Sequence, residues 1–241
     1  MSGLRPPLTM SLEAWRSRVK DWHRITREPG LTALLVLESV MIFLVIPLTG
    51  MGELPAIVLP TLFVVLVLTI LAVTWHSPIA AITVLIAVAL SPFGTLLWRE
   101  DPSPLTQWLS GGGRLLAISA LSIVVARVVF GPGRVTVHRV QGAIVLYLNF
   151  ALFFFTIYRL MEVLVPGSFS NLPHSGSEYG SGAALLYFSF STLTTLGYGD
   201  IVPLHPLARS LANLEGVIGQ LYPATLLARL VSLEIAHRRQ P

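Results

Sequence analysis

The most informative part of this sequence is Ser191-Thr192-Leu193-Thr194-Thr195-Leu196-Gly197-Tyr198-Gly199-Asp200. Gly197 and Gly199 alternate with larger residues, and glycine adopts backbone conformations that a Cβ atom disfavours. The alternation allows successive carbonyl oxygens to point towards one axis. The apolar segment from Ala183 to Leu193 is too short to cross a bilayer as a helix and is typical of a re-entrant segment. The pattern therefore predicts a re-entrant helix followed by a loop of aligned carbonyl groups.

The rest of the chain is strongly apolar. Of its 241 residues, 54% are hydrophobic and 12% are charged, whereas about a quarter of the residues of a soluble domain are charged. Six blocks are long enough to cross a bilayer core of about 30 Å as helices. They are Leu31 to Leu48, Leu54 to Trp75, Pro78 to Leu97, Arg114 to Phe130, Val140 to Val165 and Pro206 to Ile235. Because backbone polar groups must be paired inside a bilayer, we predict an all-α membrane protein with six transmembrane helices and one re-entrant helix. Glycine-rich joints are expected at residues 49–52, 111–113 and 131–133.

The basic residues indicate the orientation. If the N-terminus is cytoplasmic and six helices alternate, most of the 16 Lys and Arg residues lie on the cytoplasmic side, as the positive-inside rule requires. We therefore expect a multi-pass protein of the cell membrane with both termini in the cytoplasm. Residues 1–30 combine Trp15 and Trp22 at helical spacing with several arginines, which predicts an amphipathic helix at the lipid interface. A solvated basic tail is the alternative.

The segment Thr194 to Asp200 resembles the selectivity filter of potassium channels, whose pattern is Thr-Thr-x-Gly-Tyr-Gly-Asp. The resemblance extends from about Val140 to Glu234. It implies passive transport of K⁺, which binds to backbone carbonyl oxygens that replace its hydration shell. The implied ligands are the carbonyls of Thr195, Leu196, Gly197 and Tyr198 and the Thr195 hydroxyl, with the Gly199 carbonyl at the outer mouth. Leu196 departs from the family, in which valine is more usual at this position.

The resemblance also assigns supporting roles. Leu185 to Thr195 would be the pore helix, whose C-terminal dipole favours a cation. Tyr187 and Phe188 would brace the filter, with the Tyr187 hydroxyl bonded to the Asp200 carboxylate, while Thr194 adjoins the ion ligands. Ser191 stands where many channels place an acidic residue. Because each chain carries one filter motif and a pore needs four, we expect a homotetramer embedded in membrane lipids.

Six spans with the filter before the last one give a layout like that of voltage-gated channels. On this layout residues 31–134 form a sensor-like four-helix region, and residues 135–241 form the pore domain. A voltage sensor needs arginines at every third position of its fourth helix, but here Arg114 and Arg127 stand alone. Each charge moved through 100 mV contributes only about 2.3 kcal/mol. We therefore predict little intrinsic voltage dependence.

Two acidic residues lie inside spans, where ionisable groups are costly and usually partnered. Glu38 and Arg127 are expected at similar depths, which favours an ion pair; the alternative is that each meets water separately. Glu215 either braces the pore helix or faces the cavity.

The last span contains a candidate gate. Gly219 matches the hinge glycine of the family, Gly216 adds freedom, and Pro223 removes a backbone hydrogen bond and is expected to kink the helix. Close helix packing at the glycines and simple curvature at the proline are the alternatives.

Other functional classes receive little support. The chain has no cysteine, and it contains no Ser/His/Asp set, metal-ligand spacing or nucleotide loop, so we predict neither an enzyme nor a cofactor. A net charge of +4 does not indicate nucleic acid, because the basic residues stand beside apolar blocks. A cation-coupled transporter would need paired interrupted helices. A modulatory subunit, a poorly selective cation channel and gating by an unidentified partner remain alternatives.

Overall fold

The computed structural model of this protein describes residues 30–51, 58–74, 82–86, 89–90, 103–131, 136–173 and 178–238. The predicted amphipathic helix at the N-terminus lies outside these residues. Most of the third apolar block, Pro78 to Leu97, also lies outside them, although residues 82–86 and 89–90 are helical.

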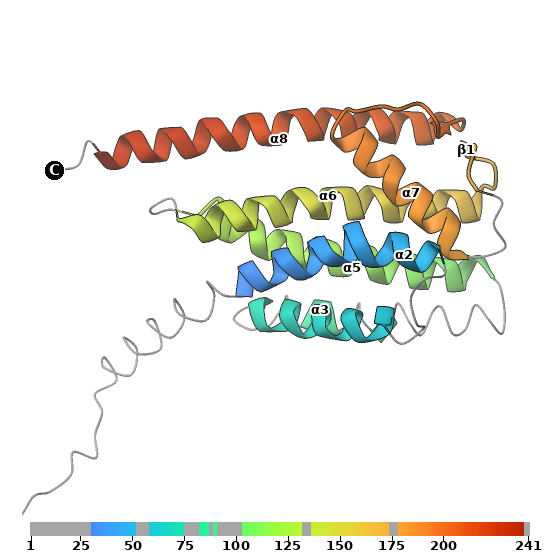
Figure 1. The fold of residues 1–241 in the computed structure, drawn as a ribbon, viewed down its shortest axis with the longest axis horizontal. Helices are drawn as coiled ribbons and strands as arrows, with labels where there is room; N and C mark the ends of the chain where they lie inside the picture. Colours follow the sequence, from blue (N-terminus) through green and yellow to red (C-terminus); the bar gives the residue numbers. More distant parts are fainter. Residues whose placement is uncertain are drawn as a thin grey trace, which may run out of the picture.

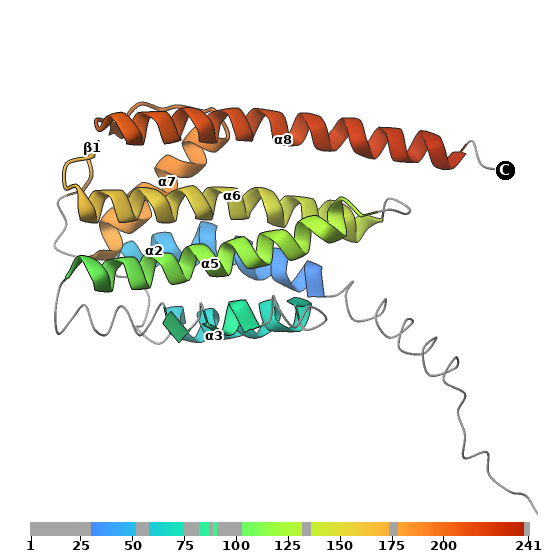
Figure 2. The same cartoon turned by 180° about the vertical axis from the view of Figure 1, so that it is seen from behind.

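Most of the described residues are helical (Figures 1 and 2). The first helix is α-helical over residues 30–40, passes through a π-helical turn, η1 (Met41–Val45), and continues as α2 (Ile46–Gly50). The wider π turn comes just before Pro47, whose ring and missing N–H disturb a regular α-helix. The other helices are α3 (Val58–Thr74), α5 (Pro104–Val129), α6 (Val137–Leu164), α7 (Glu178–Leu193) and α8 (Pro206–Arg238).

Three of the described helices are long and apolar enough to cross a membrane: Gly30–Thr49, Leu105–Val129 and Val137–Leu164. The shorter apolar helix Ser181–Leu193 is the predicted re-entrant segment. The chain is thus a mostly helical membrane protein. Its six-span topology stays a prediction.

The start of α5 differs from the prediction. The helix begins at Pro104 rather than Arg114, so the expected joint at residues 111–113 lies inside it. A capping box, in which Ser103 and Thr106 bond each other's backbone, fixes this earlier start. Gly111 serves packing instead of a turn, since a Cβ there would lie 3.3 Å from Cδ1 of Leu160 on α6.

The helices pack in three buried clusters, of which the smallest joins Ile42, Leu148 and Leu186. At one end, the first helix, α5 and α6 share a buried cluster that includes Leu34, Val125 and Val145. At the other end, aromatic side chains of α6 and α7 meet the loop after α6, with Tyr158 fully buried and Phe188 nearly so. α8 runs along α6, and α7 crosses obliquely between them (Figure 1).

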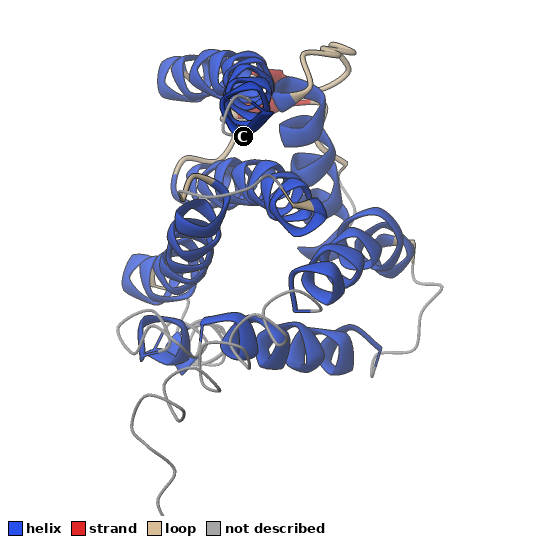
Figure 3. Cartoon of the chain, turned by 90° about the vertical axis from the view of Figure 1, so that its left-hand side faces the viewer, coloured by secondary structure: helices blue, strands red, loops and turns tan. Residues whose placement is uncertain are grey.

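A two-stranded antiparallel sheet joins the loops on either side of α7. β1 (Phe169–Ser170) pairs with β2 (Val202–Pro203), with Phe169 opposite Pro203. The sheet lies beside the start of α8 (Figure 3). It ties the segment after the glycine-rich loop to the end of α6.

Candidate functional site

The glycine-rich segment leaves the end of α7 in an unusual backbone conformation. Positive φ angles occur at every second residue: 58° at Thr195, 58° at Gly197 and 77° at Gly199. Alternation of left-handed and ordinary residues turns successive carbonyl groups towards the same side of the strand. All residues from 194 to 200 are exposed in the single chain. The sequence indicated such conformations at the two glycines, but it did not indicate one at Thr195.

Ser191, near the end of α7, connects this helix to the segment. Its carbonyl oxygen accepts hydrogen bonds from the backbone N–H of Leu196 at 2.9 Å and of Gly197 at 3.2 Å. Its hydroxyl oxygen accepts a longer bond of 3.4 Å from the backbone N–H of Tyr198. This buried serine therefore accepts hydrogen bonds from three successive backbone amides of the segment. It does so at the position where, by the resemblance, many channels have an acidic residue.

α7 extends from Glu178 to Leu193. Both its start and its end therefore come earlier in the chain than those of the predicted pore helix, Leu185 to Thr195. The left-handed conformation of Thr195 is incompatible with continuing the helix. The Thr194 hydroxyl donates to the carbonyl of Phe190, which closes the last turn at 2.6 Å.

The two aromatic residues of α7 have different surroundings. Tyr187 stacks on Tyr198, with ring centroids 5.8 Å apart and planes at 14°, and its hydroxyl interacts with the Asp200 carboxylate. Phe188 packs against Tyr158 and Phe169, in a buried cluster that also includes Ile201. Adjacent residues of a helix point about 100° apart, so the two side chains contact different neighbours, and the bracing role of Phe188 stays a prediction.

The outer end of the segment is anchored at Asp200. Its carboxylate accepts a hydrogen bond from the backbone N–H of Ile201 at 3.0 Å, and its carbonyl oxygen accepts one from Asn171 Nδ2 at 2.9 Å. Asn171 itself has a φ of 60°, directly after β1. The loop from α6 therefore fixes the position at which the segment leaves the site.

Glu215 on α8 is completely buried and contacts Ser189 of α7. The Tyr158 hydroxyl donates to Oε2 at 2.6 Å. The Ser189 hydroxyl oxygen lies 2.5 Å from Oε1 and 2.8 Å from the carbonyl oxygen of Ala151. Of the two alternatives for Glu215, bracing of the pore helix fits this geometry and exposure to a cavity does not.

The hydrogen bonds of Ser189 indicate the protonation state of the Glu215 carboxyl group. A serine hydroxyl carries one proton and can donate only one ordinary hydrogen bond. Both short contacts of Ser189 are satisfied together if it donates to Ala151 and accepts a proton held on Glu215 Oε1. A neutral carboxyl group therefore completes this network, which links α6, α7 and α8.

Gly219 is a close contact between α8 and α7. A Cβ at this position would overlap the carbonyl oxygen of Leu193 and lie 2.7 Å from its carbonyl carbon. The same carbonyl oxygen accepts a hydrogen bond from the Tyr147 hydroxyl at 3.2 Å. At Gly216 the nearest atom to a Cβ is the Thr192 carbonyl oxygen at 3.8 Å, an ordinary contact. The packing alternative therefore fits Gly219, and α8 continues as one helix through Pro223 (Figure 2).

Gln220 is a site residue that sequence reasoning missed. Its Nε2 donates to the Thr195 hydroxyl oxygen at 2.6 Å, and that hydroxyl donates to the Thr194 carbonyl at 2.7 Å. Gln220 and Thr195 border an open pocket of about 590 Å³ on the exposed face of α8. A polar side chain in an apolar span is a functional candidate by default, and this signal was present in the sequence.

The comparisons with known proteins agree with this geometry. A family model described as an ion channel matches residues 142–235, which include most of α6, all of α7, the glycine-rich segment and most of α8. These residues are therefore similar to an ion-channel domain. The resemblance to potassium channels drawn from the filter motif is thereby confirmed, and one relative below supports it by name.

Two relatives match within the channel domain. Protein LctB of Bacillus caldotenax is 33% identical over 87 residues, which cover 35% of this chain and 64% of that protein. The inward rectifier potassium channel Kirbac3.1 of Paramagnetospirillum magnetotacticum is 33% identical over 72 residues, 30% of this chain and 20% of that protein. The chain thus spans less than two thirds of either relative. No solved structure matches at a significant level.

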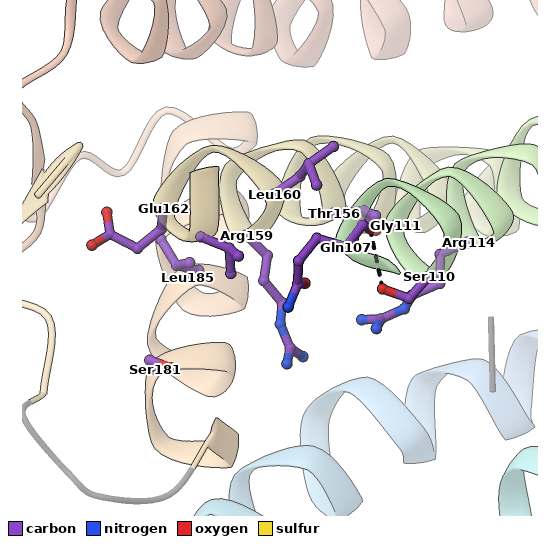
Figure 4. Close-up of a pocket in the computed structure, with 11 residues that line it drawn as sticks. Gln107, Ser110, Gly111, Arg114, Thr156, Arg159, Leu160, Glu162, Ser181 and Leu185 are labelled. Carbon is purple, nitrogen blue, oxygen red and sulfur yellow. Dashed lines mark hydrogen bonds between the residues drawn. The ribbon is translucent and has the colours of Figure 1, made fainter. Parts of the chain in front are cut away.

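Outside the channel domain, α5 places one of its two arginines beside α6. Arg114 from α5 and Arg159 from α6 border a small pocket of about 100 Å³, into which Figure 4 shows their side chains extending. Both arginines make further interactions within the chain. Arg114 is therefore held at a helix interface rather than in a series of mobile charges.

The predicted Glu38–Arg127 pair is wrong. Arg127 is exposed in the last turn of α5. Glu38 is buried and lines a pocket together with Leu121, which lies earlier in α5 than Arg127. The prediction placed Glu38 too close to the level of Arg127. Leu34, one turn before Glu38, packs in the cluster that includes Val125 and Val129, next to Arg127.

Proposed function

We propose that the chain forms a homotetrameric, potassium-selective channel that conducts K⁺ passively through the segment from Thr195 to Gly199. The observation that carries this proposal is the positive φ at every second residue of that segment. Carbonyl groups turned to one side can replace the hydration shell of K⁺. The ligands would be the carbonyls of Thr195, Leu196, Gly197 and Tyr198 with the Thr195 hydroxyl, and the Gly199 carbonyl would line the mouth.

The exposure of this segment supports assembly. Inside a membrane, irregular backbone is tolerated only where protein buries it or where it lines a water-filled cavity. Residues 194–200 are irregular and exposed in the single chain, and the adjacent face of α8 exposes Val217 and Leu221. Four copies around one axis would cover the α8 faces and leave the carbonyl groups around a water-filled path.

The arrangement in the cell follows from the sequence. We place the channel in the cell membrane with both termini cytoplasmic, residues 135–241 as the pore domain and residues 31–134 as a peripheral helical region. Movement of α8 is more easily accommodated beyond Pro223 than at Gly219, because Gly219 is in contact with Leu193. The candidate gate therefore lies in the inner half of α8.

Purified protein in liposomes tests the proposal. We expect K⁺ efflux from loaded vesicles, block by Ba²⁺, and a native mass of four chains. Gly197→Ala should abolish the K⁺ preference while the protein stays assembled, because alanine at a φ of 58° is disfavoured by about 1–2 kcal/mol. Efflux that is unaffected by Gly197→Ala would contradict conduction through this segment.

Gln220→Leu is expected to weaken Ba²⁺ block by about 5-fold, since one hydrogen bond contributes about 1 kcal/mol. The reason is that Gln220 fixes the hydroxyl of Thr195 at the inner end of the filter. Asn213→Leu is the matched control, because Asn213 borders the same pocket but has no hydrogen bond to a described filter residue. An equal change in both variants would show that Gln220 acts only through the polarity of the pocket.

Voltage should change the open probability only weakly. The charged residues of α5 are Arg114, which is held beside α6, and Arg127, which is exposed in the last turn. In symmetric K⁺ without blocking cations, we expect an open probability that changes less than about 50-fold over 100 mV, the factor that corresponds to the roughly 2.3 kcal/mol of one whole charge moved through that potential. A steep conductance–voltage curve would contradict this prediction.

A poorly selective cation channel is the second candidate, and Leu196 is the observation that favours it. This side chain is 62% exposed in the single chain and must be packed by neighbouring copies in a tetramer. If that packing fails, the filter widens and Na⁺ passes. Restoration of K⁺ preference by Leu196→Val would identify this residue as the cause.

A further inference from the structure

A third pocket lies among the first helix, α3, α5 and α6, outside the proposed ion pathway. It has a volume of about 230 Å³, and its walls are almost entirely apolar, with Ile42, Leu66, Ile70 and Leu121 among them. For comparison, an engineered apolar cavity of about 150 Å³ stays dry and binds benzene. The pocket is therefore large enough for a small organic molecule.

One polar atom in this pocket lacks a partner. Glu38 is 2% exposed and lines the pocket, and its Oε2 is the one buried side-chain oxygen or nitrogen among the described residues without a hydrogen bond. A buried polar atom without a partner has lost its hydrogen bonds to water and has gained none in the protein, which is unfavourable. A molecule that brings a hydrogen-bond donor to Oε2 recovers that cost.

Two other polar side chains of the pocket use their donors for hydrogen bonds within α6. Asn149 Nδ2 donates to the Val145 carbonyl, and the Thr156 hydroxyl donates to the Leu152 carbonyl, both within α6. Arg114 also makes interactions within the chain. A buried water generally needs two to four polar partners, and this pocket offers few that are not already bonded.

We propose that this pocket binds a small apolar molecule carrying one hydrogen-bond donor, such as an aliphatic or aromatic alcohol, whose donor bonds to Glu38 Oε2. The apolar body occupies the space between Ile42 and Leu121. The ligand reaches the pocket from the surrounding lipid, because the pocket is not enclosed on all sides.

Photolabelling of the full chain in phosphatidylcholine nanodiscs tests this site. The probes are 3-azioctanol and its hydrocarbon analogue 3-azioctane, with labelled residues located by mass spectrometry. We expect 3-azioctanol to label the pocket around Ile42 and Leu121 saturably, to be displaced by 1-octanol, and to bind about 5-fold more tightly than the hydrocarbon.

Variants separate the hydrogen bond from the cavity. Glu38→Leu should remove the preference for the alcohol, and Ala117→Phe should fill the pocket and remove labelling there. Val36→Leu, on the exposed side of the same helix, should change neither result. Equal, non-saturable labelling by both probes, or labelling unaffected by Ala117→Phe, would overturn the proposal. If Glu38→Leu does not fold, the comparison of the two probes and Ala117→Phe still decide it.

Discussion

Gly219→Ala is expected to destabilise the channel domain by about 3 kcal/mol or more, with loss of K⁺ flux. The added Cβ would overlap the carbonyl oxygen of Leu193, and a clash with backbone is relieved only if α8 moves away from α7. That movement would also disturb the Tyr147 hydrogen bond to the same carbonyl. The effect is measured as the midpoint of thermal unfolding in detergent, with size-exclusion chromatography used to monitor unfolding.

Gly216→Ala provides the control on the same helix. Its Cβ would meet nothing nearer than the Thr192 carbonyl oxygen at 3.8 Å, so the unfolding midpoint should change little. Alanine also favours a helix over glycine by about 1 kcal/mol. If Gly219→Ala were as stable as Gly216→Ala, the close contact between α8 and α7 would be contradicted.

Glu215→Leu is expected to destabilise the domain by about 1–3 kcal/mol, the cost of a buried hydroxyl left without a partner. Leucine cannot accept the bond from Tyr158, and it removes the link from α8 to Ser189. Glu215→Gln should be close to wild type, because its amide can donate to Ser189 and accept from Tyr158, as a neutral carboxyl does. Unfolding midpoints of the two variants give the comparison.

The Glu215→Gln result tests the proton count. If Glu215→Gln lowers the unfolding midpoint as much as Glu215→Leu does, the carboxyl group is ionised in the folded protein and the network depends on its charge. Ser189→Ala is a further check. It should lower the unfolding midpoint of the wild type and of Glu215→Gln by similar amounts if both use the same hydrogen-bond pattern.

The channel domain was readable from sequence because its signals are local. Gly197 and Gly199 mark backbone conformations that other residues disfavour, and the short apolar stretch before them predicted α7. The role of Gly219 was not decidable in this way. A glycine hinge and a glycine contact look the same in sequence, and only the approach of Leu193 distinguishes them.

Contacts between segments that are far apart in the sequence were harder to predict. The pairing of Glu38 with Arg127 rested on estimated depths in two helices, and a shift of one or two turns was enough to separate them. The bond from Gln220 to Thr195 joins residues of different elements that no spacing rule connects. The early start of α5 was readable in principle, because Ser103-Pro104 followed by Thr106 is a helix-start signal.

The reversal potential of the purified protein in planar bilayers, with K⁺ on one side and Na⁺ on the other, tests the central claim most directly. Conduction through the carbonyl groups of Thr195 to Tyr198 predicts a reversal potential displaced by at least about 59 mV in the direction of K⁺ selectivity, the value for a tenfold preference. A Ba²⁺-sensitive current that reverses near zero under these conditions would contradict potassium selectivity in this channel.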